Sequence, residues 1–315
     1  MGSTPPDGVE RLEMRKRHAV ISMIRNIDMV GVRLFSRLIP KLLIPFPRNQ
    51  YIIRTNHGFD LWIDPVKDSG VERSLYYTGT YEMGTLYLLG RLLREGDVYV
   101  DVGANIGLMT VYAAKTVGMK GKVLAIEPNP NTRDMLSFNV RINDLKNVNV
   151  IPYAIGSVEK EASIHDHPDN NRGKASLIRP EGSIVAHPIK VMRLDELLKD
   201  ERPIRLLKLD IEGYELEALK GMGDLLRHND RPILMIECSG KRENSHGLGT
   251  KAIHDHLEAC GGYRYFMPSK GKERKSVLVE LMGQHEFPEH DNVYCMTTTH
   301  VDELKDHGVF ERLLK

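Results

Sequence analysis

The stretch Val98–Gly107, VYVDVGANIG, constrains the fold more than any other part of this chain. Apolar residues lead up to Asp101 in the manner of a buried strand, and a loop with Gly103, Asn105 and Gly107 follows before a new apolar run begins. This pattern is typical of the turn from the first strand into the first helix of a doubly wound sheet, where ligands lie beside the backbone. We therefore expect a ligand-binding parallel sheet.

Strands and helices are expected to alternate through the rest of the main region. Further strands are predicted at 122–128, 147–155, 204–212, 232–238, 262–267 and 293–298, and helices at 86–94, 108–117, 131–143, 214–227 and 251–259. Two β-prone pieces, at 161–166 and 175–178, predict an inserted hairpin. The expected fold is α/β and Rossmann-like, with a mostly parallel seven-stranded sheet, helices on both faces, an inserted β-hairpin and an N-terminal helical and hairpin appendage.

The N-terminal part divides into a disordered start at 1–8 and a cap at 9–81, before a main domain at 82–315. Apolar spacing predicts an amphipathic helix over 9–43, and 51–65 predicts a hairpin turned at His57 and Gly58. Residues 9–48 carry nine Lys and Arg against three Asp and Glu, a local net charge of +6. We favour a helix that packs on the main domain, and peripheral membrane contact through residues 9–44 stays open as the alternative.

Composition excludes several classes of protein. The 315 residues carry 44 Lys and Arg against 43 Asp and Glu, whereas bulk nucleic-acid binders usually have a strong basic excess. Cys238, Cys260 and Cys295 are too far apart for a zinc pair and odd in number, which favours a reducing cytoplasm. The sequence has neither a secretory signal pattern nor a run of 18 apolar residues. We expect a cytoplasmic enzyme.

Two acidic residues predict which nucleotide-like ligand the sheet binds. A dinucleotide motif counted from Gly103 would need glycine where Asn105 stands and glycine or alanine where Leu108 stands. Asp101 instead suits the cationic amino-acid end of S-adenosylmethionine. Glu127 ends the second strand 20 residues after Gly107, where a carboxylate accepts hydrogen bonds from ribose hydroxyls. Asn129 is a second polar candidate. The alternative for these acids is helix capping or pairing with a basic side chain.

The chemistry of methyl transfer to a hydroxyl calls for a proton acceptor near the methyl group. Asp210 and Glu212 end the fourth strand, beside the switch point, and Asp210 is the first candidate for the base. Glu237 ends the next strand, so Asp210 and Glu237 would be ligands if the enzyme used Mg²⁺. Glu212 and Glu215 are alternatively acids of a helix N-terminus. Glu82 is a candidate for the amino-acid end of the donor or an ordinary helix-terminal acid.

Several segments together resemble the FkbM-type methyltransferase family. They are GTYE at 79–82, GDVYVDVGANIG at 96–107, EPNP at 127–130, RLDELL at 193–198 and KLDIEGYELEALKG at 208–221. The resemblance covers about 64–239 and implies a class I methyltransferase fold with S-adenosylmethionine as donor. It places Asp101, Gly103, Asn105 and Gly107 around the methionine and ribose, Glu127 at the ribose, and Tyr153 to Gly156, with Ala154, near the adenine.

The resemblance also implies O-methylation of a small-molecule acceptor, such as a hydroxyl on a sugar, glycolipid or polyketide-type product. The neutral net charge and the lack of a recognisable nucleic-acid module argue against nucleic acid as a partner. Methylation of RNA or protein, a donor-binding scaffold without catalysis, and a nicotinamide oxidoreductase are the alternatives, and a homo-oligomer stays open. The histidines at 165, 167 and 187 lack ligand spacing and are assigned no role. The run KGKERK at 270–275 is either a solvated loop or a contact for an anionic acceptor.

Overall fold

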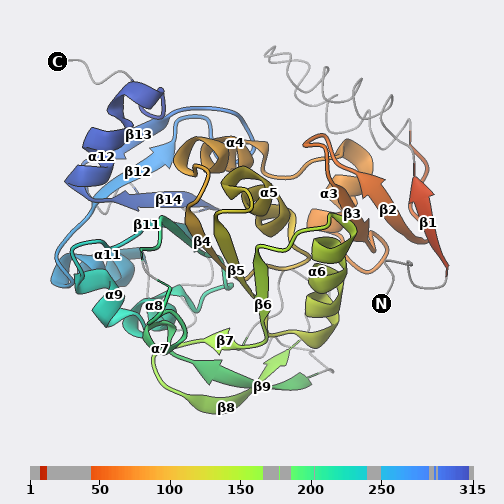
Figure 1. Ribbon diagram of the computed structural model, residues 1–315, viewed down its shortest axis with the longest axis horizontal. Helices are drawn as coiled ribbons and strands as arrows, with labels where there is room; N and C mark the ends of the chain where they lie inside the picture. The colour runs from red at the N-terminus through yellow and green to blue at the C-terminus, as the bar shows by residue number, and fades with distance from the viewer. Residues whose placement is uncertain are drawn as a thin grey trace.

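A computed structural model describes most of the chain (Figure 1). The described residues are 8–12, 44–165, 177, 186–201, 203–239, 250–283, 287–288 and 290–311. Within them no helix is both long and apolar enough to cross a bilayer. The predicted helix at 9–43 falls mostly outside these ranges, as do His167 and most of the second predicted hairpin piece.

A mixed sheet of eight described strands forms the centre of the molecule, in the order β13-β12-β14-β11-β10-β4-β5-β6. Five neighbouring strands are parallel: β6 (Val148–Ile151), β5 (Lys122–Ile126), β4 (Val98–Val102), β10 (Leu206–Leu209) and β11 (Ile233–Ser239). Antiparallel pairing continues through β14 (His290–Met296), β12 (Arg264–Pro268) and β13 (Leu278–Leu281). The predicted fold class is confirmed, and β13 adds an eighth strand to the seven expected.

Both faces of the sheet are covered, because neighbouring strand residues point in opposite directions and both sets are apolar. Tyr99 and Leu206 belong to one hydrophobic cluster, and Val100 and Leu207 to another. The first cluster includes side chains of α4 (Met83–Leu92) and α5 (Leu108–Val117). The second includes α8 (Glu215–Lys220), α9 (Gly223–Arg227) and α11 (Thr250–Ala259), which lie on the opposite side in Figure 1. The single helix predicted at 214–227 is thus two short helices.

The remaining helices complete the layers. They are α3 (Val71–Thr78), α6 (Pro130–Ile142), α7 (Leu194–Leu197), α12 (Thr298–Leu304) and the 3₁₀ turn η3 (Lys305–His307). Asn129 begins α6, because its side-chain oxygen accepts from the N–H groups of Asn131 and Thr132. The carboxylate of Asp195 likewise accepts from the N–H groups at the start of α9.

The N-terminal part forms a three-stranded sheet, β1 (Val9–Leu12), β2 (Gln50–Arg54) and β3 (Asp60–Ile63). The predicted hairpin is confirmed in β2 and β3, which are antiparallel. The prediction of helix at Val9–Leu12 is wrong, because these residues pair in parallel with β2. The hydrophobic cluster of α4 and α5 also contains Ile53 and Leu61, so the cap at 44–81 shares its core with the main domain.

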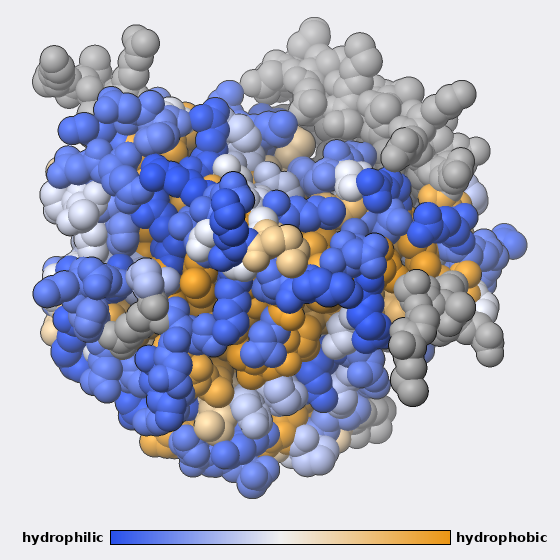
Figure 2. Space-filling view, in the orientation of Figure 1, coloured by the Kyte–Doolittle hydropathy of each residue, from blue (hydrophilic) through white to orange (hydrophobic). Residues whose placement is uncertain are grey.

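A small sheet lies beside the carboxyl ends of β4 and β5, in the order β7-β9-β8. It consists of β7 (Ala154–Ile155), β8 (Lys160–His165) and β9 (Ala186–Met192). β8 and β9 are antiparallel, which confirms an inserted hairpin with β9 as the partner of β8. Of the predicted piece at 175–178, only Leu177 lies within the described residues. The predicted third strand at 147–155 is divided between β6 and β7. Apolar surface is visible at the centre of this face of the molecule, within a mostly hydrophilic margin (Figure 2).

Candidate active site

Every backbone N–H of the loop 103–107 already donates to an acceptor in the protein. The acceptors are Ile126 O for Gly103 (3.0 Å) and Ala104 (3.1 Å), Glu127 Oε2 for Asn105 (3.0 Å), Asn105 Oδ1 for Ile106 (2.8 Å) and Ala104 O for Gly107 (3.0 Å). A pyrophosphate bound at such a turn needs backbone donors of its own. The loop therefore offers a dinucleotide little, in agreement with the missing glycine pattern.

The two glycines of the loop are required by packing within the protein. Gly103 has φ +79°, and a Cβ there would overlap the carbonyl oxygen of Asp210. Gly107 has φ +95°, and a Cβ there would lie 2.6 Å from a methyl carbon of Leu136 in α6. Asn105 also has a positive φ, of 50°. L side chains rarely adopt a positive φ, which is why glycine stands at two of these positions. The tight turn that they form brings the end of β10 beside the loop.

Glu127 lies directly after β5 and is buried. Its Oε2 accepts from the N–H of Asn105 at 3.0 Å, and its Oε1 from the N–H of Asn129 at 2.9 Å. Burial raises the pKa of Glu127 to about 7, against the lowering effect of these hydrogen bonds and of Arg133 and Lys208. Each oxygen retains a lone pair for a ligand hydroxyl. The side-chain oxygen of Asn129 already caps α6. The predicted contact of Asn129 with the donor stays a prediction.

A buried lysine links the acids of β4 and β10. Lys208 Nζ lies 3.2 Å from Asp101 Oδ1, 3.3 Å from Asp210 Oδ2 and 3.2 Å from Gly103 O. Asp101 is fully buried and also accepts from Thr110 Oγ1 at 2.7 Å. Its charge is therefore balanced inside the protein, which is the pairing alternative that the sequence left open. Contact between Asp101 and a donor ammonium stays a prediction.

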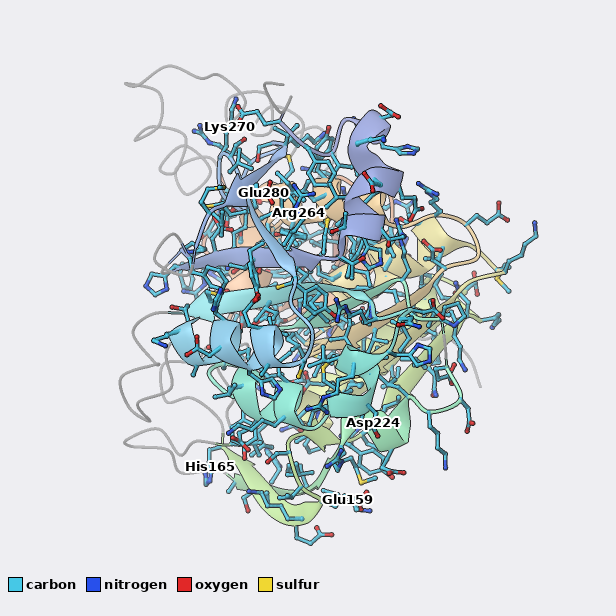
Figure 3. The ribbon with its side chains drawn as sticks, turned by 90° about the vertical axis from the view of Figure 1, so that its left-hand side faces the viewer. Glu159, His165, Asp224, Arg264, Lys270 and Glu280 are labelled. Atoms are coloured by element: carbon cyan, nitrogen blue, oxygen red, sulfur yellow. The ribbon has the colours of Figure 1, made fainter. Side chains whose placement is uncertain are left out.

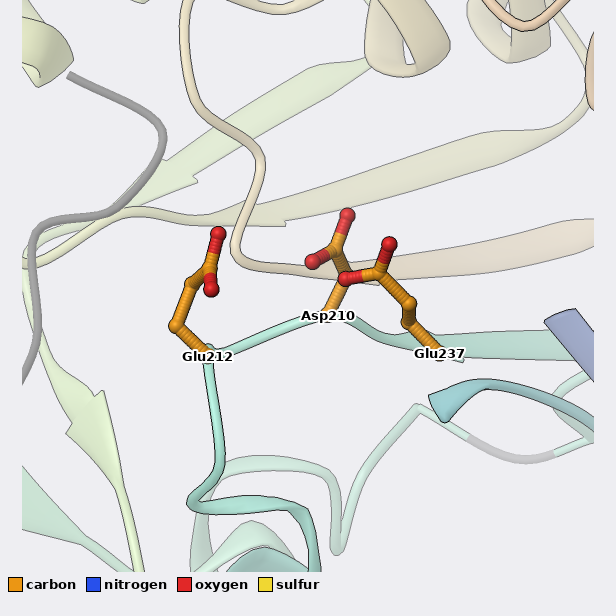
Figure 4. Close-up of side chains that lie close together, drawn as sticks. All are labelled: Asp210, Glu212 and Glu237. Atoms are coloured by element: carbon orange, nitrogen blue, oxygen red, sulfur yellow. The ribbon is translucent and has the colours of Figure 1, made fainter. Parts of the chain in front are cut away.

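Three carboxylates, from Asp210, Glu212 and Glu237, converge at the ends of β10 and β11 (Figure 4). One oxygen from each lies within 4.8 Å of the others. Burial acts to raise the pKa of Asp210, but Lys208, a hydrogen bond with Glu237 and Lys272 together hold that pKa below its usual value. The charge of Asp210, with burial, raises the pKa of Glu237 to about 9. Near neutral pH the proton of this pair therefore lies on Glu237, and Asp210 is ionised.

A second lysine reaches the same group of acids from the loop between β12 and β13. Lys272 Nζ lies 2.5 Å from Glu237 Oε1 and 2.8 Å from Glu82 Oε1. Glu82 is buried at the start of α4 and accepts from Thr85 Oγ1 at 3.1 Å. Two of the three converging carboxylates thus already have an ammonium partner. Binding of Mg²⁺ by Asp210 and Glu237 stays a prediction.

Glu215 shapes the loop that carries the candidate base. Its Oε1 accepts from the N–H groups of Ile211 (3.0 Å) and Gly213 (3.2 Å), and burial raises its pKa. Glu212, between them, has φ +57°. The left-handed residues 212 and 213 make the tight turn from β10 into α8, so Glu215 has the structural role that was its alternative.

A pocket opens between the loop after β4, the end of β5, the turn after β10 and the small sheet. Its empty volume, counted to the open mouth, is about 670 Å³, within the range of cofactor sites. Six predicted site residues line it: Gly103, Asn105, Glu127, Ala154, Asp210 and Glu212. Apolar side chains such as Ile126, Ile155 and Ile164 form much of the remaining wall. The pocket therefore combines an apolar interior with carboxylates at two edges.

The sequence predictions missed both lysines. Lys208 is the one charged residue of the buried strand LLKL, and such a residue requires a partner, which is a signal that could have identified it. Lys272 lies in KGKERK, where nothing in the pattern separates it from its exposed neighbours. His165 ends β8 and His187 lies in β9, away from the converging acids.

Comparisons with known proteins agree with the motifs. The family model described as methyltransferase FkbM domain matches residues 101–265. Hexuronic acid methyltransferase AglP of Haloferax volcanii is 35% identical over 161 residues, 50% of this chain and 63% of that protein. Methyltransferase sdnD of Sordaria araneosa is 30% identical over 163 residues, 42% of this chain and 62% of that protein. The chain thus covers just under two thirds of these relatives.

The solved structure of M. jannaschii TYW2 in complex with AdoMet aligns with 80% of this chain and 86% of its own, at 14% identity and a TM-score of 0.39, a likeness too remote to support a conclusion. The family model, by contrast, matches more than half of the chain and includes the glycine loop, Glu127 and the turn after β10. The chain belongs to the FkbM methyltransferase family.

Proposed function

We propose that this protein transfers a methyl group from S-adenosylmethionine to a hydroxyl of a small molecule, in the first place a sugar. Membership of the FkbM family supports S-adenosylmethionine as the methyl donor, which the sequence also predicted. The observation that supports the reaction is that one pocket holds both Glu127, with lone pairs for a ribose, and the ionised Asp210. These residues lie at the carboxyl ends of β5 and β10, which flank β4.

The residues of the pocket fit the donor. The Glu127 carboxylate, fixed by two backbone N–H groups, is oriented to accept hydrogen bonds from the ribose hydroxyls. Tyr153, Ala154 and Ile155 form a mainly apolar wall for the adenine. When bound, the donor supplies an electrophilic methyl group on a sulfonium. Apolar walls around it exclude water, which would otherwise compete with the acceptor.

Asp210 is proposed to hold the proton that the acceptor loses. As the acceptor oxygen forms its bond to the methyl carbon, the carbon–sulfur bond breaks with its electron pair going to sulfur, and the hydroxyl proton passes to an Asp210 oxygen. An attacking hydroxyl becomes strongly acidic while this bond forms, so a carboxylate of low pKa is a sufficient acceptor. Lys208 at 3.3 Å keeps Asp210 ionised for this step. Glu212 lies at the same edge of the pocket and is the second candidate.

The relatives support a choice of acceptor class. AglP is a hexuronic acid methyltransferase, so a sugar acid is the first acceptor to test, with neutral sugars and polyketide-type alcohols next. A cytoplasmic location stays a prediction. Residues 9–44, for which membrane contact was the alternative, lie mostly outside the described part of the chain.

The test is a calorimetric titration of the full chain with S-adenosylmethionine, S-adenosylhomocysteine and NAD, followed by an assay of S-adenosylhomocysteine release with each acceptor, with Mg²⁺ and with a chelator. We expect the first two ligands to bind, NAD not to bind, and release to depend on Asp210. Binding of NAD alone would contradict the proposal. Tight binding of the donor without turnover on any acceptor would favour a non-catalytic scaffold.

A further inference from the structure

One lysine holds three separate segments together at the edge of the candidate active site. Lys272 Nζ bridges Glu82, at the start of α4, and Glu237, at the end of β11, at 2.8 and 2.5 Å. Lys272 itself belongs to the loop between β12 and β13. These segments are more than 30 residues apart in the sequence, and Lys272 lies outside the residues that the family model matches.

The backbone of Lys272 is fixed as firmly as its side chain. Its N–H donates to Asp291 Oδ2 at 3.2 Å, and its carbonyl oxygen accepts from the N–H groups of Gly84 at 2.9 Å and Thr85 at 3.2 Å. A Cβ on Gly84 would lie 2.7 Å from that carbonyl oxygen, so glycine there permits the close approach of α4. A loop held at the N–H, the carbonyl and the ammonium of one residue places that ammonium accurately.

The ammonium acts on the reaction centre through Glu237. Glu237 is hydrogen-bonded to Asp210, the proposed proton acceptor, and the two carboxyl groups lie side by side in Figure 4. Lys272 touches Glu237 but is not among the residues that line the pocket. Without this cation, the side-chain contacts of Glu237 within the described residues are reduced to its hydrogen bond with Asp210, so the Glu237 carboxyl can turn about that contact.

We propose that Lys272 is a positioning residue for methyl transfer: it holds Glu237 against Asp210 and so orients the proton acceptor toward the acceptor hydroxyl. This inference rests on the proposed function of Asp210. It gives the run KGKERK a role that is neither a solvated loop nor an anion contact, because the ammonium of Lys272 is already shared by two carboxylates.

The matched control comes from the same loop. Lys270 is exposed at the periphery of the molecule, two residues before Lys272 (Figure 3). Lys272→Met keeps most of the length of the side chain and removes the charge, and Lys270→Met makes the same change at a lysine that forms no ion pair with the described residues. Because Lys272→Met leaves Glu82 buried without its cation, Lys272→Met with Glu82→Gln is made as well, so that a variant with balanced charge is available.

Crystal structures and turnover test the proposal together. In both Lys272 variants we expect the Glu237 carboxyl to turn away from its present orientation against Asp210, and kcat to fall about tenfold to a hundredfold with little change in the KM for the donor, since small misplacements of reacting groups cost that much. Lys272→Arg is expected to restore part of the rate, and Lys270→Met to behave as the unchanged protein. Adding Lys272→Met to Glu237→Gln is expected to cause little further loss, because the lysine acts through that side chain.

An unchanged orientation of the Glu237 and Asp210 carboxyls in both Lys272 variants would overturn the proposal, as would losses of rate from Lys272→Met and Glu237→Gln that multiply in the double variant. If the unchanged protein methylates none of the acceptors, the proposed function fails, and the crystal structures alone then decide whether Lys272 positions Glu237.

Discussion

The raised pKa of Glu127 makes donor binding depend on pH in a way that can be calculated. If only the ionised carboxylate accepts hydrogen bonds from both ribose hydroxyls, the apparent Kd is multiplied by one plus the ratio of protonated to ionised Glu127. With a pKa of about 7 this carboxyl is about nine-tenths ionised at pH 8 and about one-tenth ionised at pH 6. Affinity is therefore expected to fall about tenfold between pH 8 and pH 6, or about 1.4 kcal/mol.

The sign follows from the direction of the shift. Burial favours the neutral carboxyl in the free protein, whereas the bound ribose favours the ionised form, so binding lowers the pKa of Glu127 and releases a proton. At pH 7 the release is expected to be about half a proton per molecule bound. An ordinary glutamate, ionised throughout this range, would release none.

The assay is calorimetric titration with methylthioadenosine at pH 6, 7 and 8, in buffers of different ionisation enthalpy. Methylthioadenosine keeps the ribose but lacks the α-amino group, which titrates near 8 in the full donor and would obscure the result. Glu127→Gln is expected to bind weakly at every pH, and Glu95→Gln, at an exposed surface pair, normally. A Kd that stays within about twofold from pH 6 to pH 8 in the folded, unchanged protein would refute the reasoning.

Three further changes test other parts of the site. Asp210→Asn is expected to bind the donor nearly normally and to lose turnover about a hundredfold or more, and normal turnover in an acceptor assay would remove it from the role of base. Gly103→Ala places a Cβ against the Asp210 carbonyl at positive φ and is expected to lower the free energy of unfolding by about 3–5 kcal/mol in denaturant. Gly96→Ala, also at positive φ but in open space, is expected to lower it by about 1–2 kcal/mol. Equal losses would contradict the packing argument. Lys208→Met leaves Asp101 buried without its cation and is expected to cost about 3–5 kcal/mol by the same measurement, so unchanged stability would mean that the pair is not formed in solution.

The layers of this fold were predictable because local pattern and tertiary environment agree there. Strands such as Leu206–Leu209 are apolar at successive positions because both faces of the sheet are covered. Where the two conflict, prediction failed. No strand was predicted at β9, which contains Pro188, a residue that lacks a backbone donor and lowers strand propensity. Val9–Leu12 is too short for its period to distinguish strand from helix, and pairing with β2 decides it.

The candidate site was predictable to the extent that its residues follow strands. Glu127 and Asp210 were identified from their positions after β5 and β10, since the carboxyl ends of parallel strands meet at one edge. Lys272 could not be identified in this way. Its position depends on the contact of its loop with the start of α4, almost 190 residues away in the sequence. The sequence of a charge run does not indicate which of its residues forms an ion pair in the fold.

The same structure explains how two carboxylates in one pocket can have opposite tasks. Glu127 accepts from two backbone N–H groups and has no ion-pair partner within the described part of the chain, so burial dominates and its pKa rises to about 7, which makes its ionisation sensitive to the ligand that it binds. Asp210 has the ammonium of Lys208 beside it and a hydrogen bond with Glu237, and together with Lys272 these hold its pKa below the usual value. A carboxyl group that binds a ribose can change its ionisation when the ligand binds, whereas a carboxylate that accepts a proton must be ionised before the reaction. Environments that separate two acids in this way usually mark their division of labour. Lys208 lies 3.3 Å from Asp210 and has only a small influence on Glu127, so removing Lys208 is expected to cost turnover before it costs donor affinity.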